Sequence, residues 1–117
     1  MKERLLQLPE EIAQKRVILL NLNEEIEALK AIHKQWEADT TIIISNEVDD
    51  KGKPLHSNAE KRQAELINRI RGNSHMKSVA DAMKQMTMMY EIEKIELEKL
   101  QNTQSNLRAI TRLGGEE

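Results

Sequence analysis

Apolar residues occupy two opposite sides of the segment 74–113 when it is drawn as an α-helix. At about 100° per residue, one side carries Met76, Val79, Met83, Met86, Tyr90 and Leu97, and the other carries Met88, Ile92, Ile95, Ile110 and Leu113. A helix that is apolar on two sides needs neighbours on two sides. At about 0.8 kcal/mol per buried CH₂, leaving the second side in water would forfeit several kcal/mol, comparable with the stability of a small domain. A fold of this chain therefore has to cover both sides.

A seven-residue apolar repeat predicts a first long helix over residues 9–45. Pro9 suits the first helical position, where its missing N–H costs nothing, and Glu10 and Glu11 favour the positive end of the helix dipole. The repeat consists of Ile12, Leu19, Ile26, His33 and Thr40, followed three residues behind by Leu22, Leu29, Trp36 and Ile43, with Lys15 as the one miss. Such a repeat indicates a helix that packs in coiled-coil fashion.

The run TTIIIS at residues 40–45 contradicts this helix locally. Its five β-branched residues lose rotamer freedom in a helix and suit a strand better. We therefore expect the helix to fray or stop here, with a short β-hairpin through Ile42–Leu55 as an alternative to a simple loop over 46–56. Asp50-Lys51-Gly52-Lys53-Pro54 supplies turn chemistry in either case.

Two further helices are predicted, at 57–71 and 74–113. Ser57-Asn58-Ala59-Glu60 matches a capping box, in which two side chains satisfy backbone N–H groups at a helix start. Arg71-Gly72-Asn73-Ser74 predicts a break, because Gly and Asn end helices and Asn73 or Ser74 can cap the next one. Gly114-Gly115 is expected to stop the last helix.

The predicted fold is all-α: a single domain, 1–117, built as an elongated, coiled-coil-like antiparallel hairpin of two long helices with a short helix near its tip. A charged fraction of 32% and no aromatic residues besides Trp36 and Tyr90 are typical of long helices. The first helix covers only one side of the last, so we expect a homodimer in a four-helix arrangement. The alternative is that 57–71 folds back over the second side, although Leu66, Ile67 and Ile70 would cover only part of it.

Positive charge is concentrated in the middle of the chain. Residues 51–77 carry seven Lys/Arg against two Asp/Glu, and these form the basic segment: Lys51, Lys53, Lys61, Arg62, Arg69, Arg71 and Lys77. Such a cluster is a candidate site for phosphate backbones. No aromatic residue lies there to stack bases, so a solvated tip, or one paired with the acidic first helix, is the competing interpretation.

The sequence contains no constellation for catalysis, a cofactor or a metal. There is no Cys, the glycines form no phosphate-binding loop, and His33 with Glu37 is the closest approach to a metal pair; zinc sites collect three or four ligands. No membrane span is expected, since no run approaches about 18 uncharged apolar residues. We expect a cytoplasmic protein that is not an enzyme.

The segment DDKGKPLHSNAEKRQAEL, residues 49–66, resembles a stretch of small, mostly uncharacterised helical proteins of phages and prophages. Gly52-Lys53-Pro54, Ser57-Asn58 and Lys61-Arg62 carry the resemblance. It implies a phage-type source and a role near DNA replication, recombination or packaging, and it transfers no functional residue.

Three functions remain open from the sequence. The first is a non-catalytic interaction or scaffold protein that self-associates through Met88, Ile92, Ile95, Ile110 and Leu113. The second is a nucleic-acid-binding accessory protein that uses the basic segment. The third is an adaptor that holds a helix of another protein on the Met-rich stretch 83–92, since Met side chains adapt to varied surfaces.

Overall fold

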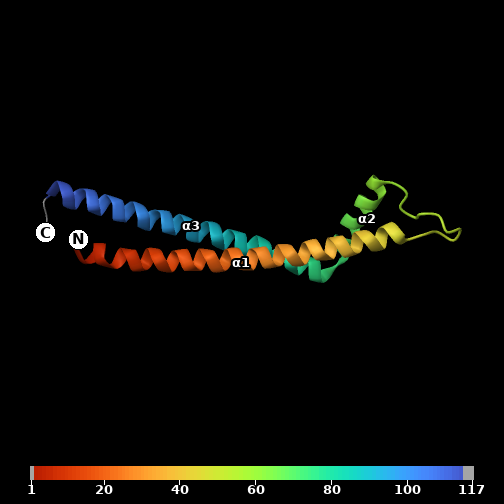
Figure 1. Ribbon diagram of the computed structural model, residues 1–117, viewed down its shortest axis with the longest axis horizontal. Helices are drawn as coiled ribbons and strands as arrows, with labels where there is room; N and C mark the ends of the chain where they lie inside the picture. The colour runs from red at the N-terminus through yellow and green to blue at the C-terminus, as the bar shows by residue number, and fades with distance from the viewer. Residues whose placement is uncertain (1, 115–117) are drawn as a thin grey trace. The chain divides into compact units, whose positions relative to one another are not determined.

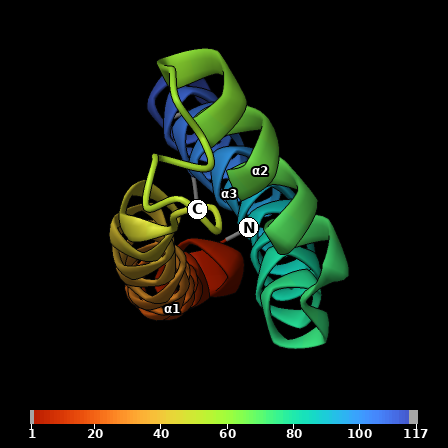
Figure 2. The same cartoon turned by 90° about the vertical axis from the view of Figure 1, so that its right-hand side faces the viewer.

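The computed structural model describes residues 2–114, most of which form three α-helices (Figure 1). They are α1 (Lys2–Asn46), α2 (Ala59–Gly72) and α3 (Ser74–Gly114). The chain divides into two compact units, 1–25 with 86–117 and 26–85. In each unit, a part of α1 and a part of α3 lie side by side and run antiparallel (Figures 1 and 2). The predicted all-α helical hairpin is confirmed.

The first unit has its core on the predicted heptad repeat, extended one heptad back from Lys15 to Leu8, which precedes the predicted helix. Leu8, Ile12 and Leu22 are buried on α1, and Leu19 is half-buried. Lys15, the polar miss in the repeat, lies on the same side of the helix and pairs with Glu93 and Glu96 of α3. The repeat therefore does pack against α3, and its gap is occupied by an ion pair instead of an apolar side chain.

The start of α1 differs from the prediction, because Pro9 lies inside the helix and not at its first position. A proline this far into a helix cannot donate to the carbonyl four residues back, which costs free energy. Burial outweighs that cost: Leu8 is 0% exposed, and Leu5 is half-buried on the same side. An ion pair between Arg4 and Glu11 also spans the proline.

In the second unit, the core of α1 follows the predicted repeat at Ile26 and Thr40, and its last buried position shifts by one residue, from Ile43 to Ile44. Ile26, Thr40 and Ile44 are buried, together with Met76 and Val79 of α3. Ile43, predicted to be the last apolar member of the repeat, is 55% exposed. A straight α-helix drifts by about 20° per heptad against a strict seven-residue repeat. After three heptads from Leu22, the buried position falls on Ile44.

The prediction that the helix frays or stops within TTIIIS is wrong, since α1 continues to Asn46. Burial of Thr40 and Ile44 overrides the β propensity of the run. The hydroxyls of Thr41 and Ser45 donate to the carbonyls of Glu37 and Thr41 at 2.7 and 2.9 Å, a bond that Ser and Thr make within helices.

A tight turn follows α1 and retains a small part of the predicted β-hairpin. Val48 and Pro54 form an isolated antiparallel bridge. Asp49 organises the turn, because its carboxylate accepts from the N–H groups of Lys51 and Lys53 at 2.9 and 3.0 Å. Gly52 has φ of 77°, a left-handed conformation that glycine adopts without steric cost.

Asparagine residues cap both later helices. Asn58, and not Ser57, is the N-cap of α2: its side chain accepts from the N–H of Lys61 at 2.8 Å. The helix start is therefore shifted by two residues, to Ala59, and the predicted capping box does not form. Asn73 caps α3 by accepting from the N–H of Met76 at 2.9 Å. Gly114 is the last residue of α3, and Gly115 lies outside the described residues.

Candidate functional site

The second apolar side of α3 is exposed. We call it the outer face of α3 and define it by Met88, Ile92, Ile95, Ile110 and Leu113. The first four side chains are 50–58% exposed and Leu113 is 90% exposed. All five belong to the part of α3 in the first unit. They form two groups along the helix, Met88 with Ile92 and Ile95, and Ile110 with Leu113. Grouped exposed apolar side chains on a soluble protein can mark an interaction site.

The opposite side of α3 is covered by its own chain. Met76 and Val79 are buried, and Met83, Met86, Tyr90 and Leu97 are half-buried. The two apolar sides predicted for this helix therefore do lie on opposite sides of α3, one covered and one exposed. The Met-rich stretch is split between the two sides, because Met83 and Met86 face inward while Met88 and Met89 are exposed.

A second exposed apolar row lies on α1 and was missed by the sequence analysis. Leu6, Val17 and Leu20 are 74%, 55% and 58% exposed. With Ala13 they follow the spacing of a helical face. Two acidic residues, Glu10 and Glu24, fall in the same row and obscure the signal. Because its side chains are about as exposed as those of the outer face of α3, this row can serve as the control surface for substitutions on α3.

Lys15 links the two helices of the first unit electrostatically. Its Nζ atom donates to Glu93 Oε2 at 2.6 Å and also to Glu96. Hydrogen bonding to Glu93, and then to Glu96, raises the pKa of Lys15 above its ordinary value. The hydrogen bond from Lys15 lowers the pKa of Glu96. The inner side of α3 is thus fixed against α1 by charge as well as by packing.

The basic segment lies wholly in the second unit, but its members have different partners. Arg69 donates to Glu65 at 2.9 Å and to Glu47 at 2.5 Å. Arg62 donates to the backbone carbonyl of His56 at 3.3 Å, and Lys61 Nζ donates to Ser57 at 3.4 Å. The other members, all exposed, are Lys51, Lys53, Arg71 and Lys77.

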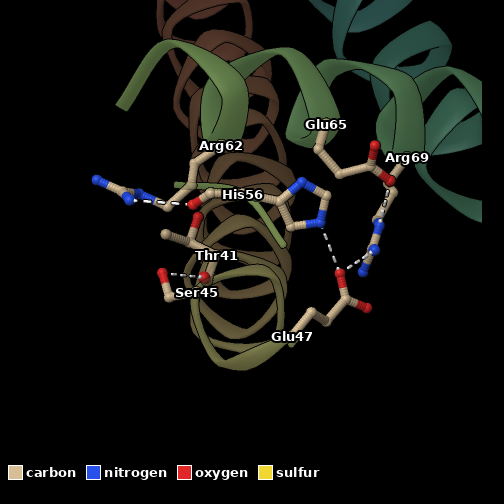
Figure 3. Close-up of polar contacts among 7 residues, drawn as sticks. All are labelled: Thr41, Ser45, Glu47, His56, Arg62, Glu65 and Arg69. Atoms are coloured by element: carbon tan, nitrogen blue, oxygen red, sulfur yellow. Dashed lines mark hydrogen bonds and ion pairs between the residues drawn. The ribbon is translucent and has the colours of Figure 1, made fainter. Parts of the chain in front are cut away.

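Figure 3 shows the network that removes Arg69 from the candidate polyanion site. Glu47 accepts from Arg69 and lies 3.0 Å from His56 Nε2, so it joins the turn after α1 to α2. The hydrogen bond from Arg69, and then that from His56, lowers the pKa of Glu47. The arrangement is that of a structural ion-pair network, and it places an acid within the predicted basic cluster.

Residues 2–114 were compared with the requirements of a metal site and of a membrane span. His33 Nδ1 lies 3.1 Å from Glu37 Oε1, an i,i+4 pair on α1. Residues 2–114 contain no group of three or more side chains placed to hold a metal ion. Within the same range, no helix has an apolar stretch long enough to cross a bilayer.

The outer face of α3 is therefore the feature that calls for a functional explanation. It is apolar, exposed and built on a continuous helix whose other side is already packed. Neither family models, nor curated proteins, nor solved structures give a match to this chain.

Proposed function

We propose that this chain is a non-catalytic helical interaction module that self-associates through the outer face of α3. The observation that supports the proposal is the exposure of five apolar side chains by half or more on a helix already packed on its other side. Fully burying one such side chain is worth about 1.5–3 kcal/mol. Covering the remaining exposed part of five of them on each chain would supply several kcal/mol toward offsetting the cost of association.

Polyanion binding by the basic segment has weaker support. Arg69 is engaged by Glu47 and Glu65, and Arg62 by a backbone carbonyl. Lys51 and Lys53 stand on the turn organised by Asp49. An acidic residue within or beside the cluster opposes a phosphate at those positions.

The test is the mass of the chain in solution, measured by light scattering after size exclusion. Wild-type protein is expected at twice the 13.5 kDa of one chain. The double variant Ile92→Gln, Ile95→Gln is expected at 13.5 kDa, with its helical circular dichroism retained, because both side chains are exposed and Gln is a good helix former.

The matched control is Val17→Gln, Leu20→Gln on α1, where the exposed fractions are similar, 55% and 58%. This variant is expected to remain a dimer. A monomeric wild-type chain at high micromolar concentration would contradict the proposal. So would dissociation by the α1 variant with no effect of the α3 variant.

A further inference from the structure

Four of the five residues of the outer face of α3, all except Ile110, belong to a longer row of exposed residues with alternating steps of four and three. The row consists of Met88, Ile92, Ile95, Lys99, Asn102, Asn106, Ala109 and Leu113, and every member is exposed. Alternating four- and three-residue steps are the core spacing of a coiled coil. The row is apolar at both ends and polar in the middle, and that distribution restricts how a partner helix can lie on it.

The row matches a second copy of itself in the antiparallel sense. If the dimer axis passes between Leu100 and Gln101, residues equally far from that point on the two chains face one another. Met88 then meets the partner's Leu113, and Ile92 meets the partner's Ala109. Lys99 meets the partner's Asn102 in the middle. The two outer layers at each end are thus apolar on both chains and the central layers are polar, while Ile95 facing the partner's Asn106 is the one mixed layer of each half.

The residues that flank the row are complementary in the same register. Coiled coils carry their interhelical ion pairs at such flanking positions. Glu91, one residue before Ile92, lies beside the partner's Arg112, one residue before Leu113. Both side chains are exposed, and no ion pair of either is found among residues 2–114. The two-fold axis repeats this pair at the other end. On the opposite flank, Met89 meets the partner's Ile110, another apolar contact.

A parallel pair would bring like charges together. Lys99 would face the partner's Lys99 in the core, and Glu91 would lie beside the partner's Glu96 on the flank. Like charges at facing positions disfavour a coiled-coil pairing. Charge thus selects the antiparallel sense, and the polar middle of the row selects the register.

We propose that α3 pairs with α3 of a second copy, antiparallel, about an axis between Leu100 and Gln101, with Glu91 bound to the partner's Arg112 at both ends. This inference rests on the proposed self-association and specifies its geometry. The polar centre, Lys99 with Asn102, lowers affinity relative to an apolar row and excludes shifted pairings, as a polar core residue does in other coiled coils.

Cysteine cross-linking tests the sense and the register, because the chain has no cysteine of its own. Two single variants are made, Ile92→Cys and Ala109→Cys, both at exposed positions. Oxidation of either alone is expected to leave uncross-linked chains, because the two copies of one position are about 25 Å apart along the axis at 1.5 Å per residue. An equimolar mixture is expected to form the disulfide-linked heterodimer, since a disulfide requires Cα atoms within about 7 Å.

Rapid self-cross-linking of each single variant would show a parallel pair and overturn the inference. A dimer by light scattering with no cross-link in the mixture would overturn the register while leaving self-association intact. A monomer by light scattering would overturn the proposed function, and the register with it.

Charge reversal supplies an independent readout of the flanks. Glu91→Arg and Arg112→Glu each replace two attractions with two repulsions, so each variant is expected to raise the dissociation constant about tenfold. Mixing the two is expected to produce a heterodimer with both pairs restored, at near wild-type affinity. If the mixture binds no more tightly than either variant alone, Glu91 and Arg112 are not partners.

Discussion

In the first unit, the side chain of Lys15 adds an ion pair to the apolar contacts between α1 and α3. It stands where the heptad repeat calls for an apolar residue, and its ammonium group reaches Glu93 and Glu96 across to α3. Its side chain is 24% exposed, so the stem packs while the charge is held by the two carboxylates. The sequence marks Lys15 as the break in the pattern, but its partners lie 78 and 81 residues away, a separation that helical periodicity cannot reveal.

The pH dependence of stability is expected to change in Lys15→Met. The pKa of Glu96 is lowered in the folded chain, so its contribution is present above the unfolded pKa and is lost as pH falls through the folded value. The pKa of Lys15 is raised, so its contribution is present below 10.5 and is lost as pH rises through the folded value. Urea unfolding across pH should therefore give a wild-type curve that falls at both ends and a flatter one for the variant.

Lys30→Met is the control for this measurement. Its pair with Glu27 is exposed on both sides, at 59% and 60%, and such pairs contribute little. The control should leave the pH profile of wild type unchanged. Parallel curves for wild type and Lys15→Met would show that the pair with α3 adds nothing to stability.

At the scale of single elements, helix existence was predictable and helix ends were predictable only in part. The ends at Asn46, Gly72 and Gly114 lie one residue from the predicted ones. The errors at Pro9 and in TTIIIS share a cause: local propensity favoured a helix end, but buried Leu8, Thr40 and Ile44 hold the chain helical. Which residues of α1 are buried depends on packing against α3, and the propensity of each residue alone carries no information about that packing.

The identity of the α2 cap gives a prediction at this scale. Asn58→Ala is expected to lower the free energy of unfolding by about 1 kcal/mol, because the N–H of Lys61 loses its acceptor. Ser57→Ala is the matched control and should change it by only a few tenths, since the Ser57 hydroxyl accepts only an exposed 3.4 Å contact from Lys61 Nζ. Urea denaturation followed by circular dichroism measures both. A larger loss for Ser57→Ala than for Asn58→Ala would show that Ser57 is the N-cap, as the predicted capping box requires.

At the scale of the whole chain, the two-sided pattern of α3 was readable from sequence because five exposed apolar residues recur at helical angles. The similar row on α1 was not, because Glu10 and Glu24 interrupt Leu6, Val17 and Leu20. The positive charge of the basic segment was visible in the sequence, but the pairing of Arg69 with Glu47 and Glu65 was not. Those acids lie 22 and 4 residues from Arg69, and only the fold brings the distant one close.

The proposed self-association predicts that the thermal stability of the whole chain depends on protein concentration. Higher protein concentration favours the folded dimer over unfolded monomers. The midpoint of thermal unfolding is therefore expected to rise as the wild-type concentration rises. The Ile92→Gln, Ile95→Gln variant should give one midpoint at all concentrations. Circular dichroism over a hundredfold concentration range measures this, with Val17→Gln, Leu20→Gln as the variant expected to behave like wild type. A constant wild-type midpoint would argue against a folded dimer.

The helical state of TTIIIS has a consequence for the chain when it opens. Residues 40–45 form an uncharged, β-branched run without proline, the composition of segments that stack into cross-β fibrils. Ile42 and Ile43 already face solvent, so only the α-helical backbone conformation keeps the run from adding to a neighbouring strand. Asp39 and Glu47, which bracket it, would meet their own copies in any in-register stack and act there as electrostatic gatekeepers against amyloid.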